Sequence, residues 1–430
     1  MRAPEAAERS ETAGEKRKIP LTVPKLGNEE AVAARAAILS GWVTQGPRVR
    51  EFEETFASYS QSRHACAVSS CTAALHLALT VLGVRPGDVV LTVSHSFIAT
   101  ANAVRHCQAE PVFVDIDSDT LNMDPGMLAR SLEKDFEKRD GALWYGEVDR
   151  LAVGESPLRG RAGPVGRLAG ILVVHQVGMP ADIARVMDVA GEHGVPVAED
   201  AACAAGSEIR AVGAEQWEKI GRPHGDIACF SFHPRKIITT GEGGIITSND
   251  SRLDGRLRLL RHQGMSVSDL ERHRSSEVVF EDYVTTGFNY RMTDIQAAVG
   301  IEQLKRLDEI VARRRFLADR YAELLDQLTG LKAPREPAWA RTNWQSYIVR
   351  LEDASLQRKV MQELRNRGID VRRGIMCAHL EPPYSSAWPR GCLPRSERAR
   401  DCGLTLPLYP DMDEKDLETV VDALRSAIEK

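Results

Sequence analysis

The sequence predicts an α/β protein with a mostly parallel sheet covered by helices, followed by a smaller α+β domain. Apolar runs such as 111–115 and 170–175 alternate with segments of helical periodicity, as in parallel strands joined by crossover helices. These runs are apolar throughout, which is typical of strands buried on both faces. The last part of the chain changes pattern and ends in an amphipathic segment at 416–428.

The elements follow from local patterns, taken in chain order. A helix opens after Ser69-Ser70, where Leu75, Leu79 and Leu82 recur at helical spacing. Thr293 and Gln296 form a capping box that opens another helix. The remaining predictions are strands at 88–93, 111–115, 170–175, 195–198, 226–231, 244–247 and 347–349, and helices at 97–105, 181–193, 293–328, 359–367 and 416–428.

These elements divide the chain into three parts. Residues 1–24 form a leader that we expect to be disordered, because its first 18 residues are polar and charged and lack the apolar core of a signal peptide. Residues 25–300 form a large domain, with a surface insertion at about 132–166 where periodicity is lost. Residues 301–430 form a small C-terminal domain, entered through a linking helix.

Composition excludes several classes of protein. The chain has 430 residues, of which 43% are hydrophobic and 27% charged, as in an ordinary globular protein. Its net charge of -5 argues against a nucleic-acid partner. No apolar run approaches the roughly 20 residues that span a bilayer, so we expect no membrane partner and a cytoplasmic location. The eight cysteines form no C-x-x-C pair, so zinc spacing is absent and buried reduced thiols are the preferred interpretation.

The most informative segment is Ser-Phe-His-Pro-Arg-Lys at 231–236, followed by a glycine-rich turn at 239–244. Ligands of open α/β folds bind at the carboxyl ends of strands, which is where this segment lies. Lys236 at that point forms an imine only through its neutral amine, so burial or a nearby cation such as Arg235 must lower its pKa. A solvated loop lysine is the alternative, and it is the better interpretation of any single lysine.

Other strand and helix ends carry candidate groups. Glu199 and Asp200 end an apolar strand, and a buried Asp200 needs a cationic partner such as a pyridinium nitrogen; a helix N-cap is the alternative. The helix start at Ser70-Cys71-Thr72 is an anion site or simple capping. Phe97 either stacks on a planar ligand or belongs to the core. Three histidines are candidates for catalysis: His175, His233 and His379. For each of them, a hydrogen-bonded structural role is the preferred interpretation.

Taken together, these segments resemble the DegT/DnrJ/StrS sugar aminotransferases from about Lys25 to the C-terminus. The matching segments are Gly46-Pro47 before Phe52-Glu53, Ser70 to Leu79, Pro111 to Asp117, Glu199 to Ala202, Ser231 to Gly244, Gly287 to Gln303, and Leu406-Pro407-Leu408. The resemblance implies a fold-type I enzyme that uses pyridoxal 5'-phosphate (PLP), with a large domain of the seven-stranded type. It also implies a homodimer with shared active sites.

The resemblance assigns roles residue by residue. Lys236 resembles the Schiff-base lysine, and Asp200 the acidic partner of the pyridine nitrogen. The implied phosphate ligands are Ser231, Cys71, Thr72 and, on the cofactor of the neighbouring subunit, Asn289; Phe97 lies where an aromatic ring stacks on the cofactor. The family often has Gly in place of Cys71, and Gln or His in place of Cys203. Cys203 is therefore a weaker partner for the cofactor's phenolic oxygen.

The implied reaction moves an amino group from an amino acid, expected to be L-glutamate, to a nucleotide-activated keto-sugar in amino-sugar or natural-product biosynthesis. A keto-cyclitol is the alternative acceptor. A PLP-dependent sugar dehydratase ranks lower, since that branch typically replaces the lysine with histidine. A non-catalytic PLP-binding regulator is the alternative outside enzymes. No metal is implied.

Overall fold

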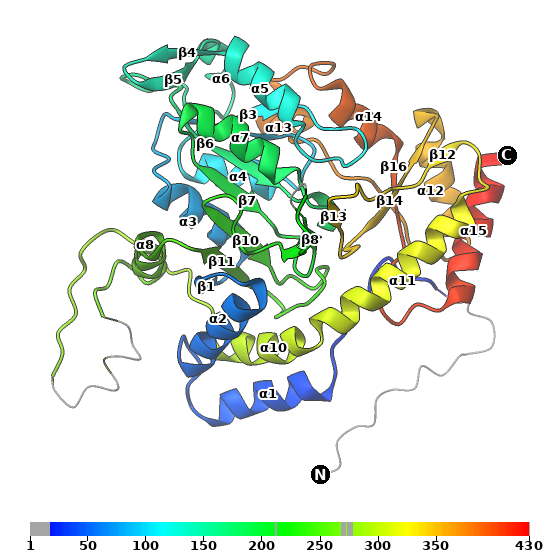
Figure 1. The fold of residues 1–430 in the computed structure, drawn as a ribbon, viewed down its shortest axis with the longest axis horizontal. Coiled ribbons are helices and arrows are strands. Elements are labelled where there is room, and N and C mark those ends of the chain that lie inside the picture. The colour runs from blue at the N-terminus through cyan, green and yellow to red at the C-terminus, as the bar shows by residue number, and fades with distance from the viewer. Residues whose placement is uncertain (1–17, 211–212, 268–271, 273–277, 430) are drawn as a thin grey trace.

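A computed structural model describes residues 18–210, 213–267, 272 and 278–429. The molecule consists of a large body around a central sheet and a smaller body, joined by two consecutive helices (Figure 1). The central sheet has seven strands in the order β1-β11-β10-β7-β6-β2-β3. The strands are β1 (His64–Val68), β2 (Val89–Val93), β3 (Glu110–Val114), β6 (Leu168–Val174), β7 (Val197–Asp200), β10 (Ile227–Ser231) and β11 (Gly244–Ser248).

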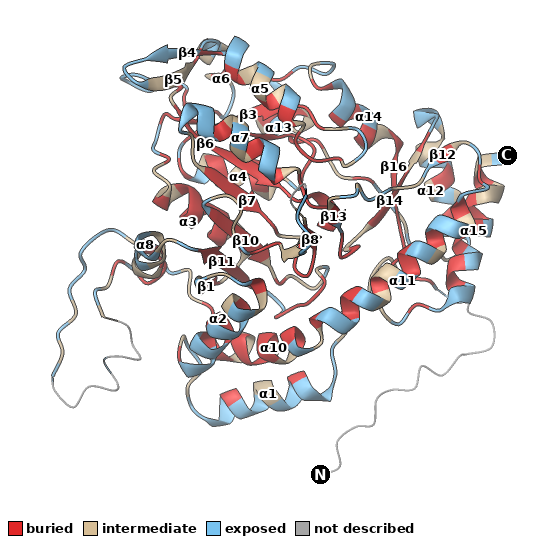
Figure 2. Ribbon diagram, in the orientation of Figure 1, coloured by how far each residue is buried: buried red, intermediate tan, exposed pale blue. Residues whose placement is uncertain are grey.

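Six of these strands run in one direction, because only β11 pairs antiparallel with its neighbours β1 and β10. The prediction of a mostly parallel sheet is confirmed. Figure 2 shows the strands buried beneath helices. Each strand sends alternate residues to two cores: in β10, Ala228 and Phe230 join one cluster while Ile227 and Cys229 join the other. This double burial explains why the strands are apolar throughout.

Helices cover both faces of the sheet. The cluster that contains Ile227 is covered by α3 (Cys71–Val81), α4 (Ala99–His106) and α8 (Ser251–Arg261). The opposite cluster is covered by α2 (Pro47–Ser60), α5 (Pro125–Lys134), α7 (Ile183–His193) and α10 (Asp294–Lys305). Helix α1 (Asn28–Leu39) lies outside these layers, and smaller elements are η1 (Gln176–Gly178), η2 (Ala354–Leu356) and a three-stranded sheet of β13 (Ala340–Arg341), β8 (Glu208–Ile209) and β9 (Glu218–Lys219).

The smaller body has its own antiparallel sheet, ordered β12-β14-β16-β15. These strands are β12 (Leu331–Lys332), β14 (Tyr347–Leu351), β15 (Arg372–Arg373) and β16 (Gly403–Leu406), packed with α12 (Gln357–Asn366) and α15 (Glu414–Glu429). The capping box of Thr293 and Gln296 is confirmed. The helix that it opens is wrongly predicted as continuous, because α10 ends at Lys305 and α11 (Leu307–Leu325) begins after Arg306.

The predicted disordered leader is wrong for its last residues. Ile19 is 3% exposed and joins the core of the smaller body. Its backbone N–H donates to Gly368 O, and its carbonyl accepts from Asp370 N, both at 2.9 Å. A single apolar residue between charged and proline residues gives no periodic signal, so the sequence did not reveal this contact. Residues 1–17 lie outside the described residues.

The segment after β15 crosses back to the large body. It contains η3 (Ala378–Leu380), α13 (Pro382–Ser385) and α14 (Pro394–Cys402). The rings of Tyr384 and Trp388 pack against Phe113 at 6.0 and 5.3 Å between centroids. Part of the predicted small domain of residues 301–430 therefore packs into the core of the large one.

The insertion has its own secondary structure. β4 (Phe136–Arg139) and β5 (Ala142–Tyr145) form a hairpin, which α6 (Val148–Leu151) follows. The Arg150 guanidinium lies 4.3 Å over the Trp388 ring, so the insertion is docked on the crossing segment. Among the described residues, no helix combines the length and apolar character needed to cross a bilayer.

Candidate active site

A cavity of about 570 Å³ lies where the parallel strands of the large body end and the smaller body begins. The ends of β6, β7 and β10 reach it from the sheet, and the first turn of α3 reaches it from the side. The smaller body contributes residues 345–346, 372–376, 405–406 and 408. A cavity at the carboxyl ends of parallel strands is where open α/β folds bind ligands.

Successive residues at the end of β7 have different roles. Glu199 points away from the cavity and is fully paired: its carboxylate meets His175 Nε2 at 2.8 Å and accepts from His224 N and Gly225 N at 2.8 and 2.7 Å. Burial alone would raise the pKa of Glu199, but these partners lower it. The next side chain, Asp200, lines the cavity. Period-two alternation along the strand separates the structural acid from the one that is free to meet a ligand.

Asp200 is buried, and its carboxylate has hydrogen-bond donors but no cationic partner among the described residues. Its carboxylate accepts hydrogen bonds from Thr100 Oγ1 at 2.7 Å and from Ala202 N at 3.2 Å. The second bond is a local turn contact, and no helix begins directly after Asp200 in the described part of the chain, so the N-cap alternative is wrong. Burial raises the pKa of Asp200 above its usual value, despite these two bonds and the charge of Lys236. The structure offers no ion pair to Asp200 within hydrogen-bond distance among the described residues, so a cation in the cavity would find a ready partner.

Lys236 lies in the same cavity. Its Nζ is 3.1 Å from Cys203 Sγ. Burial lowers the pKa of the lysine, as expected, but Cys203, Cys71 and Asp200 together outweigh burial and raise it. Without a ligand the net direction is therefore opposite to the predicted one, because the neighbours of this amine are thiols and a carboxylate. Arg235 does not reverse the direction.

The first turn of α3 lines the cavity with Ser70, Cys71 and Thr72. Ser70 caps the helix by accepting from Ala73 N at 3.2 Å, so the capping alternative is correct. The N–H groups of Cys71 and Thr72 precede the intrahelical ladder and face the cavity, which both residues line. Ser231 lines the cavity from the end of β10. Cys71 does not have a positive φ, so its Cβ is accommodated where the family often has glycine.

The other predicted residues divide by location. Phe97 and Cys203 line the cavity, and Phe97 is 68% exposed, so its ring is not part of the core. Asn289 is exposed and is not among the residues that line the cavity. It lies opposite His262 in an isolated bridge near the end of the segment that joins α8 and α10. Its predicted role on a neighbouring subunit is therefore not tested by one chain.

The histidines are mostly structural. His175 accepts from Ala181 N at 3.0 Å through Nδ1 and faces Glu199 through Nε2. His379 is fully buried outside the cavity between Ser94 and Glu397. His233 lines the cavity, and burial lowers its pKa.

Sequence reasoning missed the arginines of the smaller body. Arg372 and Arg373 form β15, are exposed and line the cavity, as does Arg235 from the large body. Arg373 lies 3.8 Å from Glu381, a loose ion pair. No sequence pattern indicates that β15 lies beside a cavity whose other wall belongs to the large body. The positions of Arg372 and Arg373 are therefore revealed only by the tertiary structure.

Comparisons with known proteins agree over nearly the whole chain. A sequence model of the DegT/DnrJ/EryC1/StrS aminotransferase family matches residues 24–425. The spore coat polysaccharide biosynthesis protein SpsC of Bacillus subtilis (strain 168) is 32% identical over 95% of this chain and 97% of SpsC. The aminotransferase TlmJ from Streptoalloteichus hindustanus is 33% identical, with a TM-score of 0.78 over 96% of this chain and 99% of TlmJ. DesV of S. venezuelae is 30% identical, with a TM-score of 0.81 over the same shares.

Proposed function

This chain belongs to the DegT/DnrJ/EryC1/StrS aminotransferase family of fold-type I, PLP-dependent enzymes, and on that premise we propose that it transfers the amino group of L-glutamate to a nucleotide-activated keto-sugar. One observation carries the proposal for this chain. Asp200, from the end of β7, and Lys236, from the turn after β10, line one cavity of about 570 Å³.

The residues present fit PLP. Asp200 is a buried acid to which none of the described residues brings a cationic partner at hydrogen-bond distance, and this suits a protonated ring nitrogen. The start of α3, with Thr72 and Ser231, suits a phosphate, and Phe97 is an exposed ring on the same wall. When bound, PLP supplies an aldehyde that condenses with amines and a ring that accepts electrons from the reacting bond.

Each residue then has a defined task. Lys236 Nζ would hold the cofactor through its aldehyde and, when free, would serve as the general base that moves a proton to and from the donor's α-carbon. Asp200 would keep a proton on the ring nitrogen of the bound cofactor. The N–H groups of Cys71 and Thr72 and the Ser231 hydroxyl would hold its phosphate. Cys203 would be a weak hydrogen-bonding partner for its phenolic oxygen.

The charge at the cavity mouth supports an anionic acceptor. Arg235, Arg372 and Arg373 approach from the two bodies, and guanidinium groups pair well with carboxylates and phosphates. A nucleotide-activated sugar carries a diphosphate, whereas an unphosphorylated keto-cyclitol does not. The arginines therefore favour the keto-sugar over the cyclitol alternative. They also suit the carboxylates of L-glutamate.

We propose a homodimer that shares its active sites. The described part of the segment between α8 and α10 carries large apolar side chains with little cover: Val278 is 83% exposed and Phe280 87%. This segment projects from the body in Figure 1 and leads to Asn289. Burial against a second copy would remove this apolar surface from water, and Asn289 of one protomer would then reach the phosphate in the other.

The half-reaction with L-glutamate tests the proposal. The PLP-loaded protein, mixed with glutamate, should change its absorbance from the pyridoxal to the pyridoxamine form and release 2-oxoglutarate. The pyridoxamine form should then aminate members of a panel of nucleotide keto-sugars, and keto-cyclitols more weakly. A protein that binds PLP but never completes the first step would instead be a PLP-binding regulator. Release of water from the sugar without amine transfer would indicate a dehydratase.

A further inference from the structure

The contact between Cys203 and Lys236 is unusual for a position that in this family often holds Gln or His. Cys203 Sγ lies 3.1 Å from Lys236 Nζ, and Cys203 lines the cavity. All eight cysteines are free, and Cys203 is one of two that are partly exposed. Its thiol therefore contacts the Lys236 amine at the cavity and not within the hydrophobic core.

Hydrogen bonds to Asn343 hold the backbone of the turn that carries this thiol. Asn343 Nδ2 donates to the carbonyl oxygens of Cys203 and Ala205, at 2.8 Å each. Asn343 N in turn donates to Ser207 Oγ at 3.0 Å, and Ser207 Oγ donates to Gly178 O at 2.6 Å. These buried bonds hold the turn after β7 so that residue 203 projects towards Lys236. The contact therefore does not depend on a mobile loop.

The thiol also affects the charge of the amine. Burial lowers the pKa of Lys236, but the charge and hydrogen bond of Cys203 are the largest opposing influences, ahead of Cys71 and Asp200. The other titratable groups near the amine are His233, whose pKa burial lowers, and Glu242 beside it. A thiol is both a weak donor and a weak acceptor, unlike the amide of glutamine, so it is able to exchange a proton with the amine.

We propose that Cys203 is a positioning residue that holds the Lys236 amine protonated in the cofactor-free protein and so sets the pH at which the lysine captures an aldehyde. This inference rests on the proposed function of Lys236. In the capture step the ammonium first loses its proton to solvent or to Cys203 in its thiolate form. The neutral nitrogen then forms a C=N bond with the aldehyde carbon, and one water molecule leaves.

The test is the rate of PLP capture by cofactor-free protein between pH 6 and 10, followed by absorbance, for the wild type, Cys203→Ala and Cys203→Ser. The matched control is Cys392→Ala, because Cys392 is the other partly exposed thiol and lies outside the cavity. We expect Cys203→Ala to move the rate profile to lower pH and to raise the rate at pH 7.5 about threefold, because the amine then loses its proton more readily. Cys203→Ser should lie between, and Cys392→Ala should match the wild type.

Superimposed profiles for the wild type, Cys203→Ala and Cys203→Ser would overturn the inference while leaving the proposed function intact. A wild type that captures no PLP at all would instead overturn the proposed function. Circular dichroism checks the fold of each variant, and Cys203→Ser decides the question if the alanine variant is unfolded. As a second readout, iodoacetamide should alkylate Cys203 in cofactor-free protein and much more slowly after PLP loading, as mass spectrometry of the peptide would show. Equal alkylation in both forms would place the thiol away from the captured ring and contradict the proposal.

Discussion

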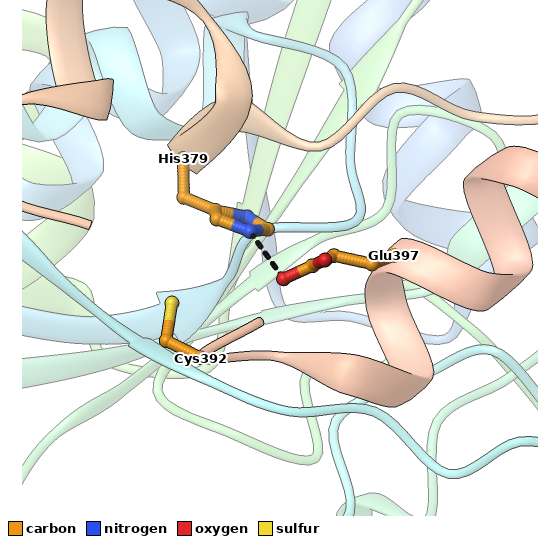
Figure 3. A group of neighbouring side chains, drawn as sticks. All are labelled: His379, Cys392 and Glu397. Atoms are coloured by element: carbon orange, nitrogen blue, oxygen red, sulfur yellow. Dashed lines mark hydrogen bonds and ion pairs between the residues drawn. The ribbon is translucent and has the colours of Figure 1, made fainter. Parts of the chain in front are cut away.

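Two regions of the molecule bring together an acid, a thiol and a nitrogen base, yet only one has open space between them. In the cavity these are Asp200, Cys203 and Lys236. In the crossing segment they are His379, Cys392 and Glu397, whose ligand atoms all lie within 4.8 Å of one another. Figure 3 shows the imidazole and the carboxylate of the second group facing one another directly.

The second group is satisfied internally. Ser94 Oγ lies 2.6 Å from His379 Nδ1 and accepts from His379 N at 3.0 Å, so its hydroxyl donates to the ring. The other ring nitrogen then donates to Glu397 at 3.2 Å, and the carboxylate also accepts from Gly391 N at 2.6 Å. Hydrogen bonds therefore explain this arrangement. The comparison teaches that residue types alone do not make a site; their polar groups must face space and not one another.

Replacement of Lys236 should give the largest effect, because it removes the nitrogen base from the group of residues that faces open space. Lys236→Ala should lose PLP capture and lower transaminase activity by about a thousandfold or more, because the general base is removed. Its melting temperature should change little, since the lysine lines a cavity. Lys305→Ala, an exposed lysine paired with Glu302, is the control and should retain full activity. Normal turnover by Lys236→Ala would refute the assignment.

Replacement of the two acids at the end of β7 should have different effects: the change at Asp200 should lower activity, and the change at Glu199 should lower stability. Asp200→Asn should lower activity about a hundredfold or more while leaving the fold intact, because it removes only the partner of the ring nitrogen. Glu199→Gln should instead lower the free energy of unfolding by about 3 kcal/mol, because the buried carboxylate that accepts hydrogen bonds from His175 and two backbone N–H groups is replaced by an amide that can accept fewer of them. Urea unfolding and steady-state assays measure both. The opposite pattern would mean that the roles of the two acids are reversed.

A substitution in the group of His379, Cys392 and Glu397 should change the free energy of unfolding but not the activity. Glu397→Ala should lower the free energy of unfolding by about 2 kcal/mol, because His379 and two backbone N–H groups lose their acceptor. PLP capture per folded molecule should be unchanged. Dialysis against EDTA should leave the melting temperature of the wild type unchanged, and a stoichiometric metal in elemental analysis would contradict the hydrogen-bonded interpretation.

The smallest expected effect is on pH dependence. Burial lowers the pKa of His379 below its usual value, although Glu397 opposes this. The unfolded chain therefore binds a proton at higher pH than the folded one, and stability is full above the unfolded pKa and falls as pH falls through it. His379→Gln should reduce the slope of unfolding free energy between pH 7 and 5. An unchanged slope would mean that the ring is already charged in the fold.

Much of the large body was determined by local sequence. Apolar runs of four to six residues predicted the strands of the central sheet except β1, and the capping box at Thr293 predicted the start of α10. The same patterns placed Asp200 and Ser231 at strand ends and Lys236 in the turn beyond one of them, where the cavity is found. These features are readable because strand burial and helix capping depend on neighbours a few residues apart.

Other features were decided only by tertiary structure. Nothing near Ile19 indicates that it packs beside Ile369, and nothing near Arg372 indicates that it lines a cavity opened by β7 and β10. Likewise, only the fold sets the thiol of Cys203 against Lys236 and directs Glu199 away from the cavity. Such contacts join residues far apart in the chain, and their energies depend on shape and charge at a meeting point that neither segment encodes alone.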